Sequence, residues 1–234
     1  MIEAVDAGVA WEPHLSGGSK ARVLAVFSKA TYLQFDSEVV AIVTTDVPRG
    51  PLHLRVHHLP QLEVGQSFVL EPIGERPQRC WVPAPVDGNA LLRSHPSLPN
   101  ADGSALAGSA AVQRASQALN DHDLVGIVRH LAGLGPGLTP SGDDVLAGIL
   151  LVASLTERFS SSDLRAAAET AGTHDISRSF LRWAANGHSI EPVHDLLLAV
   201  AAGRPTHEAE LAVAAVGATS GHDLLLGMRL ALNL

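Results

Sequence analysis

Residues 133–151 read GLGPGLTPSGDDVLAGILL, a loop rich in glycine and proline that runs directly into an apolar segment. The segment stays almost free of polar residues from Val145 to Ala153, which predicts a helix surrounded by other helices. The first turn of a helix carries unpaired backbone N–H groups and about half a positive charge. The stretch therefore predicts a loop at the start of a central helix, in a geometry that suits a carboxylate or a phosphate.

Five residues of this loop are predicted to bind the ligand. Glycines allow the backbone to come close to a small anion, and hydroxyl groups add hydrogen-bond donors. The predicted ligand-binding residues are Gly135, Gly137, Thr139, Ser141 and Gly142.

Two adjacent carboxylates, Asp143 and Asp144, follow the loop and are the candidate catalytic residues. Paired carboxylates can bind a divalent cation, orient a substrate amide or act as a general base. The spacing does not choose among these roles, so a divalent cation stays open and no metal ligand is assigned.

Helix capping is the simpler interpretation of the same stretch. Thr139 or Ser141 would cap the helix, Pro140 would lie in its first turn, and the two aspartates would oppose the helix dipole. Capping accounts for one hydroxyl and one carboxylate. It does not require three glycines, two hydroxyls and two carboxylates together, so we favour a ligand site.

A partial copy of this pattern occurs near the C-terminus. Residues 141–148 read SGDDVLAG and residues 220–227 read SGHDLLLG, and both precede an apolar run. Two helix starts built alike can converge on one ligand, or they can be two similar caps on packed helices. On the first interpretation Ser220, Gly221 and Asp223 join the predicted site.

Other chemistry finds less support in the sequence. His174-Asp175 and His222-Asp223 each pair an imidazole with a carboxylate, but no histidine spacing typical of a metal site occurs, and ordinary polar roles are favoured. The glycine-rich loop follows a helix pattern instead of a strand, and no lysine follows it into the helix, so ATP and NAD sites are disfavoured. No cofactor is predicted.

Composition limits the class of protein. The chain has 234 residues, of which 46% are hydrophobic and 17% charged, so it is expected to fold. Its net charge of −8 disfavours nucleic acids and anionic membranes as partners. The only cysteine, Cys80, is expected to be structural and to suit a reducing compartment. With neither a signal peptide nor a membrane span in the sequence, a cytoplasmic location is expected.

The fold class predicted is α+β, with a β-rich part at residues 1–100 and a helical part at residues 101–234 that carries the loop 133–144. The first part should form a small antiparallel sheet or barrel, and residues 83–103 should form a linker or crossover. Seven or eight helices should follow Ser104, and Asp121 should cap the one that contains residues 124–131. The predicted strands are Arg22–Phe27, Thr31–Phe35, Val39–Thr44, Leu52–Val56, Ser67–Glu71 and Arg79–Val82.

The signature Gly-x-Gly-Pro-Gly-Leu-Thr-Pro-Ser-Gly-Asp-Asp at residues 133–144 resembles a family that was long catalogued as a domain of unknown function. One branch of that family is the AllH subunit of oxamate carbamoyltransferase, which acts in allantoin and hence purine catabolism. Residues 219–223 resemble the family's second block. Residues 173–177 and 181–187 resemble a third block.

The resemblance implies a transferase subunit that works with other subunits of a hetero-oligomeric enzyme. The reaction would be phosphorolysis of oxalurate to oxamate and carbamoyl phosphate, or the turnover of a related carbamoyl or carboxylate compound. The loop would bind a small anion, Asp143 or Asp144 would orient the amide or take a proton, and Ser220 and Asp223 would close the site. The alternative is a non-catalytic subunit that binds a small anion or serves assembly.

Overall fold

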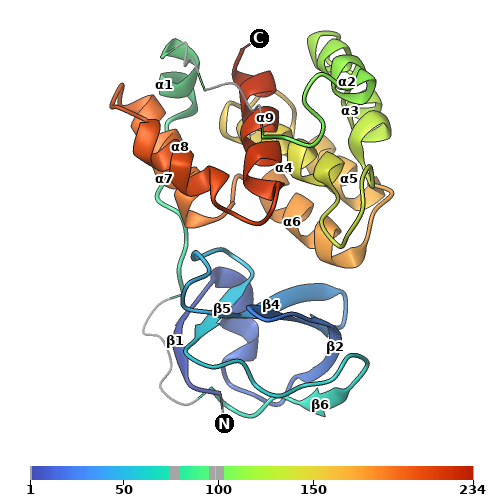
Figure 1. Cartoon of the computed structure of the whole chain (residues 1–234), viewed down its shortest axis with the longest axis vertical. Coiled ribbons are helices and arrows are strands. Elements are labelled where there is room, and N and C mark those ends of the chain that lie inside the picture. Colours follow the sequence, from blue (N-terminus) through green and yellow to red (C-terminus); the bar gives the residue numbers. More distant parts are fainter. Residues whose placement is uncertain (1, 74–79, 95–97, 99–102, 234) are drawn as a thin grey trace. The chain divides into compact units, whose positions relative to one another are not determined.

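The computed structural model describes residues 2–73, 80–94, 98 and 103–233. The chain divides into two compact units, Met1–Pro83 and Ala84–Leu234 (Figure 1). The first unit contains the sheet and the second contains the α-helices, so the predicted α+β class is confirmed. Among the helices of the described residues, none is long and apolar enough to cross a membrane.

The described part of the N-terminal unit holds a six-stranded sheet with the strand order β1-β5-β4-β3-β2-β6. Neighbouring strands pair antiparallel except β4 and β5, which run parallel. The predicted antiparallel sheet is therefore correct for most pairs. The elements are β1 (Ala4–Ala7), the 3-10 helix η1 (Val9–His14), β2 (Lys20–Val26), β3 (Ala30–Phe35), β4 (Glu38–Thr44), β5 (His53–Val56) and β6 (Ser67–Val69).

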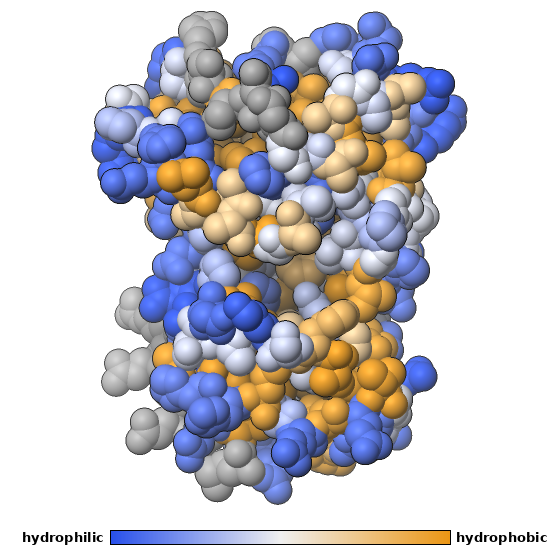
Figure 2. Space-filling model, viewed as in Figure 1, coloured by the Kyte–Doolittle hydropathy of each residue, from blue (hydrophilic) through white to orange (hydrophobic). Residues whose placement is uncertain are grey.

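The core of this unit follows the two-residue period of its strands. In β3 the buried positions alternate with half-buried ones, while the middle of β4 is buried throughout. Trp11 is fully buried, and its indole N–H donates a 2.9 Å hydrogen bond to the Leu52 carbonyl oxygen. On the face shown in Figure 2, hydrophobic residues also gather on the surface where β2 and β6 lie.

Two sequence expectations differ from the observed sheet. Strand β1 and η1 were not expected, because their short, mixed sequences lack a clear alternation. Of the expected strand Arg79–Val82, Arg79 lies outside the described residues, and Trp81 pairs with Gly8 through a single bridge.

The described part of the C-terminal unit contains nine α-helices. Eight of them follow Ser104, which agrees with the seven or eight expected. The first lies inside the stretch interpreted as a linker, where the Asp87 side chain accepts a 3.1 Å hydrogen bond from the Ala90 N–H and starts a short helix. The helices are α1 (Gly88–Arg93), α2 (Ala110–Asn120), α3 (Leu124–Leu131), α4 (Ser141–Leu155), α5 (Ser161–Thr170), α6 (Asp175–Ala185), α7 (Glu191–Ala201), α8 (His207–Ala214) and α9 (Ser220–Leu232).

Helices α4 and α9 form the centre of this unit, as the apolar runs predicted. Every residue from Val145 to Ala153 is buried, and so is every residue from Asp223 to Met228. The two helices lie beside each other in Figure 1. A helix that is apolar on all sides can be stable only when other helices surround it.

The contact between α4 and α9 is reciprocal and depends on two glycines. A Cβ atom built at Gly148 would lie 2.4 Å from the Leu224 carbonyl oxygen, and one built at Gly227 would lie 2.0 Å from the Val145 carbonyl oxygen. Gly148 matches Gly227, and Val145 matches Leu224, in the internal sequence copy. The two copies thus pack against each other about a local twofold relation, with backbone touching backbone.

We predict that Gly148→Ala lowers the free energy of unfolding by about 2 kcal/mol or more, because the added methyl group must push two buried backbones apart. Gly172→Ala is the matched control, since a Cβ there meets nothing within 4 Å, and its effect should stay within about 0.5 kcal/mol. Urea unfolding of the full chain measures both. Equal stability of the two variants would contradict the packing described.

Candidate functional site

The start of α4 has no side-chain cap. Pro140 occupies the N-cap position, and its carbonyl oxygen accepts hydrogen bonds from the N–H groups of Asp143 at 2.8 Å and Asp144 at 3.2 Å. The N–H of Gly142 donates to the Leu134 carbonyl oxygen at 2.8 Å. The simpler interpretation, in which Thr139 or Ser141 caps the helix, is therefore wrong.

The loop before α4 requires its glycines. Gly133, Gly135 and Gly137 have φ angles of 70°, 120° and 91°, a region that other residues rarely adopt. A Cβ atom at Gly135 would also lie 3.1 Å from the backbone nitrogen of Ser141. The loop therefore folds back over the first N–H group of α4, while residues 133–137 stay exposed to solvent.

Asp143 is buried and fully engaged. One carboxylate oxygen accepts a 2.7 Å hydrogen bond from the Gly133 N–H. The other oxygen accepts hydrogen bonds from the hydroxyl groups of Thr173 and Ser177, the latter at 2.6 Å. Asp143 thus ties the loop and α4 to the start of α6, and all of its partners are donors within the chain.

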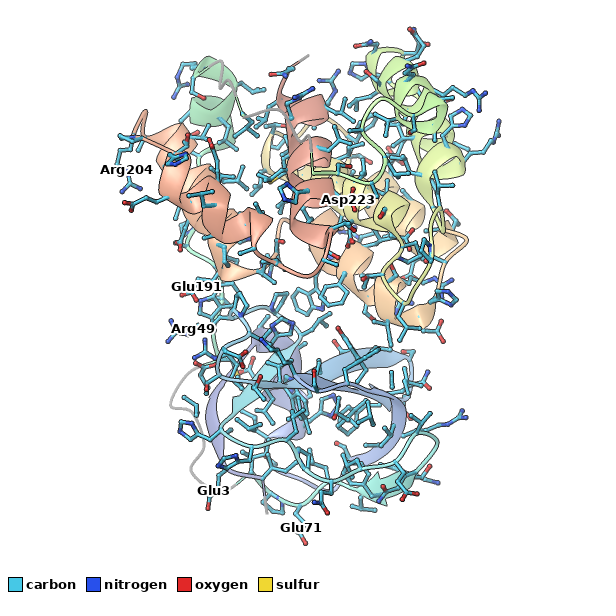
Figure 3. The ribbon with its side chains drawn as sticks, in the orientation of Figure 1. Glu3, Arg49, Glu71, Glu191, Arg204 and Asp223 are labelled. Atoms are coloured by element: carbon cyan, nitrogen blue, oxygen red, sulfur yellow. The ribbon has the colours of Figure 1, made fainter. Side chains whose placement is uncertain are left out.

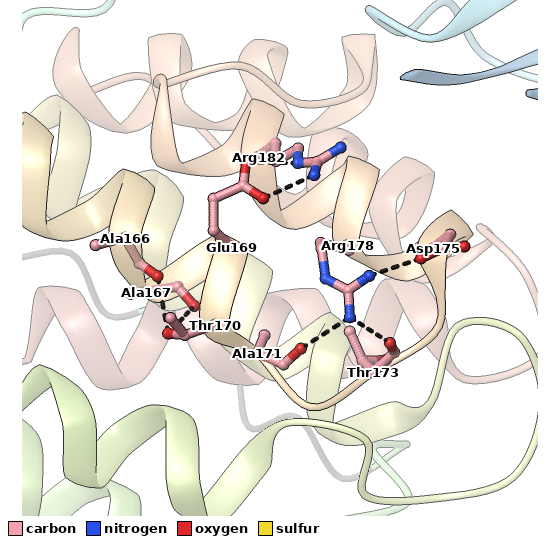
Figure 4. Close-up of polar contacts among 9 residues, drawn as sticks. All are labelled: Ala166, Ala167, Glu169, Thr170, Ala171, Thr173, Asp175, Arg178 and Arg182. Carbon is pink, nitrogen blue, oxygen red and sulfur yellow. Dashed lines mark hydrogen bonds and ion pairs between the residues drawn. The ribbon is translucent and has the colours of Figure 1, made fainter. Parts of the chain in front are cut away.

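Arg178 holds the α5–α6 connection that supplies Thr173. Its guanidinium donates to the carbonyl oxygens of Thr173 at 2.7 Å and Ala171 at 3.2 Å, and to the Asp175 carboxylate at 2.6 Å (Figure 4). Asp175 is therefore occupied by an ion pair. His174 is the N-cap residue of α6, and its side chain makes no capping hydrogen bond.

The start of α9 repeats the start of α4. The Gly221 N–H donates to the Val216 carbonyl oxygen at 2.9 Å, as Gly142 does to Leu134. A Cβ at Gly221 would lie 1.9 Å from the Val213 carbonyl oxygen, and one at Gly142 would lie 2.1 Å from the Leu131 carbonyl oxygen. In both copies a glycine lets the new helix pack tightly on the end of the preceding one.

The two helix starts lie next to each other. The hydroxyl oxygens of Ser141 and Thr219 are 3.4 Å apart. Ser220 hydrogen bonds to the carboxyl group of Asp144, which links the first turn of α9 to that of α4. Neither helix has a side-chain cap. The structure therefore brings Ser141, Asp144, Ser220 and Asp223 into one cluster, with Gly135 beside Ser141.

Asp144 differs from Asp143 in its surroundings. Burial raises the pKa of Asp144 to about 7, the Ser220 hydrogen bond opposes that rise, and the charges of Asp223 and Asp143 add to it. Its Oδ2 atom is buried and has no hydrogen-bond partner among the described residues. Asp144 is thus the carboxyl group of the loop that is poised to exchange a proton near neutral pH.

Asp223 is the second carboxyl group of the cluster. It is 0% exposed, and its Oδ1 atom accepts a short hydrogen bond from the Ser104 hydroxyl. Its Oδ2 atom is buried without a partner among the described residues. In the internal sequence copy Asp223 matches Asp144, so each helix start contributes one carboxyl oxygen that lacks a donor.

The structure also describes the surroundings of His222 and Cys80 and the residues that could form a metal cluster. The His222 imidazole packs against the backbone of Gly103, where a Cβ would lie 2.6 Å from the ring. Cys80 is half-buried, and burial raises the pKa of its thiol, which does not favour a nucleophilic role. Within the described residues no group of three or more His, Cys, Asp or Glu side chains could hold a metal ion.

Sequence reasoning missed several residues of this cluster. Ser104 is 119 positions from Asp223, and no sequence signal connects them. Thr173 and Ser177 lie in a block of family resemblance, but no local pattern marks them as partners of Asp143. Thr219 immediately precedes the second copy and likewise carries no pattern that marks it as a neighbour of Ser141.

A groove of 790 Å³ lies elsewhere in the helical unit, between α3 and α5. Its lining contains none of the predicted site residues and is mostly apolar. The fold and the site together define a protein with a duplicated helix–loop–helix, in which two helix starts without side-chain caps lie beside the carboxyl groups of Asp144 and Asp223.

Residues 131–232 match the model of the family described as oxamate carbamoyltransferase subunit AllH. The match begins at the end of α3 and ends with α9, so it covers both helix starts. It confirms the family resemblance that the sequence indicated, over this part of the chain. No solved structure matches the chain.

We predict that Ser177→Ala destabilises the protein by about 1.5–3 kcal/mol, because it removes a hydrogen bond to a buried carboxylate. Ser162→Ala, at an exposed position of α5, is the control and should change stability by less than about 0.5 kcal/mol. Urea unfolding provides the comparison. If Ser177→Ala were as stable as the control, Asp143 would not depend on this contact.

A pH dependence of stability follows from Asp144. Its folded-state pKa of about 7 lies above the ordinary value of 3.8, so the folded state holds the proton more tightly. The resulting stabilisation is complete below about pH 4 and is lost as the pH rises through about 7. Asp144→Asn cannot ionise, so its stability relative to the natural chain should rise across that range.

Urea unfolding at a series of pH values measures this difference. Asp121→Asn, which changes an exposed carboxylate, gives the baseline. A difference between Asp144→Asn and the natural chain that did not change with pH would show that Asp144 has an ordinary proton affinity.

Proposed function

We propose that the chain is a subunit of an oxamate carbamoyltransferase-like enzyme, which converts oxalurate and phosphate to oxamate and carbamoyl phosphate, and that it carries the group that transfers the proton. The observation that supports it most is the meeting of two uncapped helix starts beside Asp144, whose pKa burial raises to about 7. The family match supports the enzyme class and the presence of other subunits. We place the enzyme in the cytoplasm, since a single cysteine suits a reducing compartment.

The anionic groups of the substrates would lie at the two helix starts, where the backbone dipoles favour negative charge. The hydroxyl groups of Thr139 and Ser141 are the side-chain donors available there, whereas the Ser220 hydroxyl already donates to Asp144. Gly142 and Gly221 already donate their N–H groups to chain carbonyls, so their contribution is to allow close packing. Gly135 and Gly137 would let the loop follow the shape of the ligand.

Asp144 would transfer the proton in the reaction. A phosphate oxygen forms a bond to the ureido carbon of oxalurate, and the bond from that carbon to the bridging nitrogen breaks. The proton lost by phosphate must reach this nitrogen, which leaves as the amide of oxamate. A carboxyl group with a pKa of about 7 can accept and return a proton at neutral pH.

Asp143 would act as a positioning residue. Its oxygens accept from Gly133, Thr173 and Ser177, so its role in this proposal is to hold the loop and the start of α4 in place. In this proposal Asp143 fixes the geometry of the loop, and Asp144 accepts and returns the proton.

A non-catalytic subunit that binds a small anion is the second candidate. The observation in its favour is that two grooves, one between α3 and α5 and one beside β2 and β3, are lined by residues outside the predicted site. A site completed by another subunit would have this property. In that case the chain would bind anions without Asp144 taking part in turnover.

Calorimetry and turnover separate the candidates. We expect the full chain to bind phosphate, carbamoyl phosphate, oxamate and oxalurate, measured with and without Mg²⁺. In the enzyme assembled with its own partner subunits, Asp144→Asn should lower turnover by about 100-fold or more, as loss of a general acid–base group does. Binding of phosphate should persist.

Asp121→Asn is the charge-matched control for turnover and should behave like the natural chain. Turnover that survives Asp144→Asn while anion binding is retained would support the non-catalytic candidate. Absence of binding for all four compounds, both to the isolated chain and to the enzyme assembled with its partner subunits, would contradict both candidates.

A further inference from the structure

In the described part of the chain, the carboxyl groups of Asp144 and Asp223 each have a buried oxygen without a donor. Asp144 Oδ2 and Asp223 Oδ2 are both buried and lack hydrogen-bond partners among the described residues. Asp223 is 0% exposed, and Figure 3 labels it near the start of α9. A buried carboxylate oxygen without a partner costs free energy, so these two positions favour a ligand that supplies hydrogen-bond donors.

The contacts of Asp223 fix which oxygen is available. Ser104 donates to Oδ1, which leaves Oδ2 as the remaining acceptor. Ser220 similarly binds Asp144 from the facing helix. Each carboxyl group is therefore held by one hydroxyl and keeps one free acceptor, in matching positions of the two sequence copies.

The surroundings of the two carboxyl groups limit the class of ligand that can bind there. The positive ends of the two helix dipoles oppose a cationic donor at this position. A pure oxyanion brings acceptors only and would face two carboxyl oxygens. A neutral amide nitrogen brings up to two N–H donors, and an attached carbonyl or carboxylate brings the acceptors that the helix starts favour.

We propose that Asp144 and Asp223 form a subsite for the amide nitrogen of a carbamoyl compound, in which each carboxyl group accepts one N–H of the ligand. This proposal deepens the proposed function and rests on it. Asp223 then determines specificity by selecting amides over oxyanions of the same shape. During the reaction the bridging nitrogen of the substrate would lie between Asp144, which exchanges the proton, and Asp223, which orients the N–H.

Oxamate and oxalate are the matched probes for this subsite. They have the same size and planar shape, and they differ in that oxamate carries an amide where oxalate carries a second carboxylate. Calorimetry of the full chain should be done above the pKa of Asp144, which burial raises to about 7, so that the Asp144 carboxyl group accepts. We expect oxamate to bind at least about tenfold more tightly than oxalate, because unpaired acceptors reject the second carboxylate.

Asp223→Asn tests the assignment directly. Asparagine keeps the Oδ1 acceptor for Ser104 and replaces Oδ2 with an NH2 donor, so the fold should be preserved. The preference for oxamate over oxalate should fall by about tenfold or reverse, because oxalate now meets a donor. Asp121→Asn is the control and should match the natural chain.

Each outcome bears on a different claim. Equal binding of oxamate and oxalate by the natural chain would overturn the amide subsite while leaving the anion site of the proposed function intact. An unchanged preference in folded Asp223→Asn, verified by urea unfolding, would overturn the role of Asp223. Absence of binding for both compounds would overturn the subsite together with the proposed function.

Discussion

The close approach of α4 and α9 at Gly148 and Gly227 is the constraint on which the helical unit depends. Backbone touches backbone there, and a methyl group on either glycine would overlap a carbonyl oxygen of the facing helix. Because the contact is reciprocal, it also sets the first turns of both helices side by side, with Ser141 and Thr219 in contact. Larger side chains at the crossing would separate the helix starts and open the carboxyl cluster to water.

This packing explains why two adjacent aspartates differ. Asp143 faces α6 and the loop, where three donors satisfy it. Asp144 faces α9, where it meets Ser220 and the buried Asp223, and its pKa rises. A helix turns by about 100° per residue, so consecutive residues reach different neighbours. Structural support and proton exchange can therefore be assigned to neighbouring positions of one motif.

The sequence predicted the features that depend on local pattern. The fold class and the central position of α4 and α9 follow from apolar runs and glycines, while the repeated motif offered convergence of the two helix starts as one of two interpretations. Prediction from the sequence failed where contacts between distant parts of the chain determine the structure. Asp123, not the expected Asp121, caps α3, since two nearby aspartates offer the same local signal. The bond from Ser104 to Asp223 spans most of the helical unit and has no local signal.

Amide chemical-shift mapping of the full chain on addition of oxamate tests the central claim most directly, because it locates the ligand without requiring turnover. The account predicts that the largest ¹H–¹⁵N shifts occur in residues 135–144 and 219–223, at the starts of α4 and α9 together. Shifts confined to the groove between α3 and α5, or to only one of the two helix starts, would contradict a ligand site shared by the paired helices.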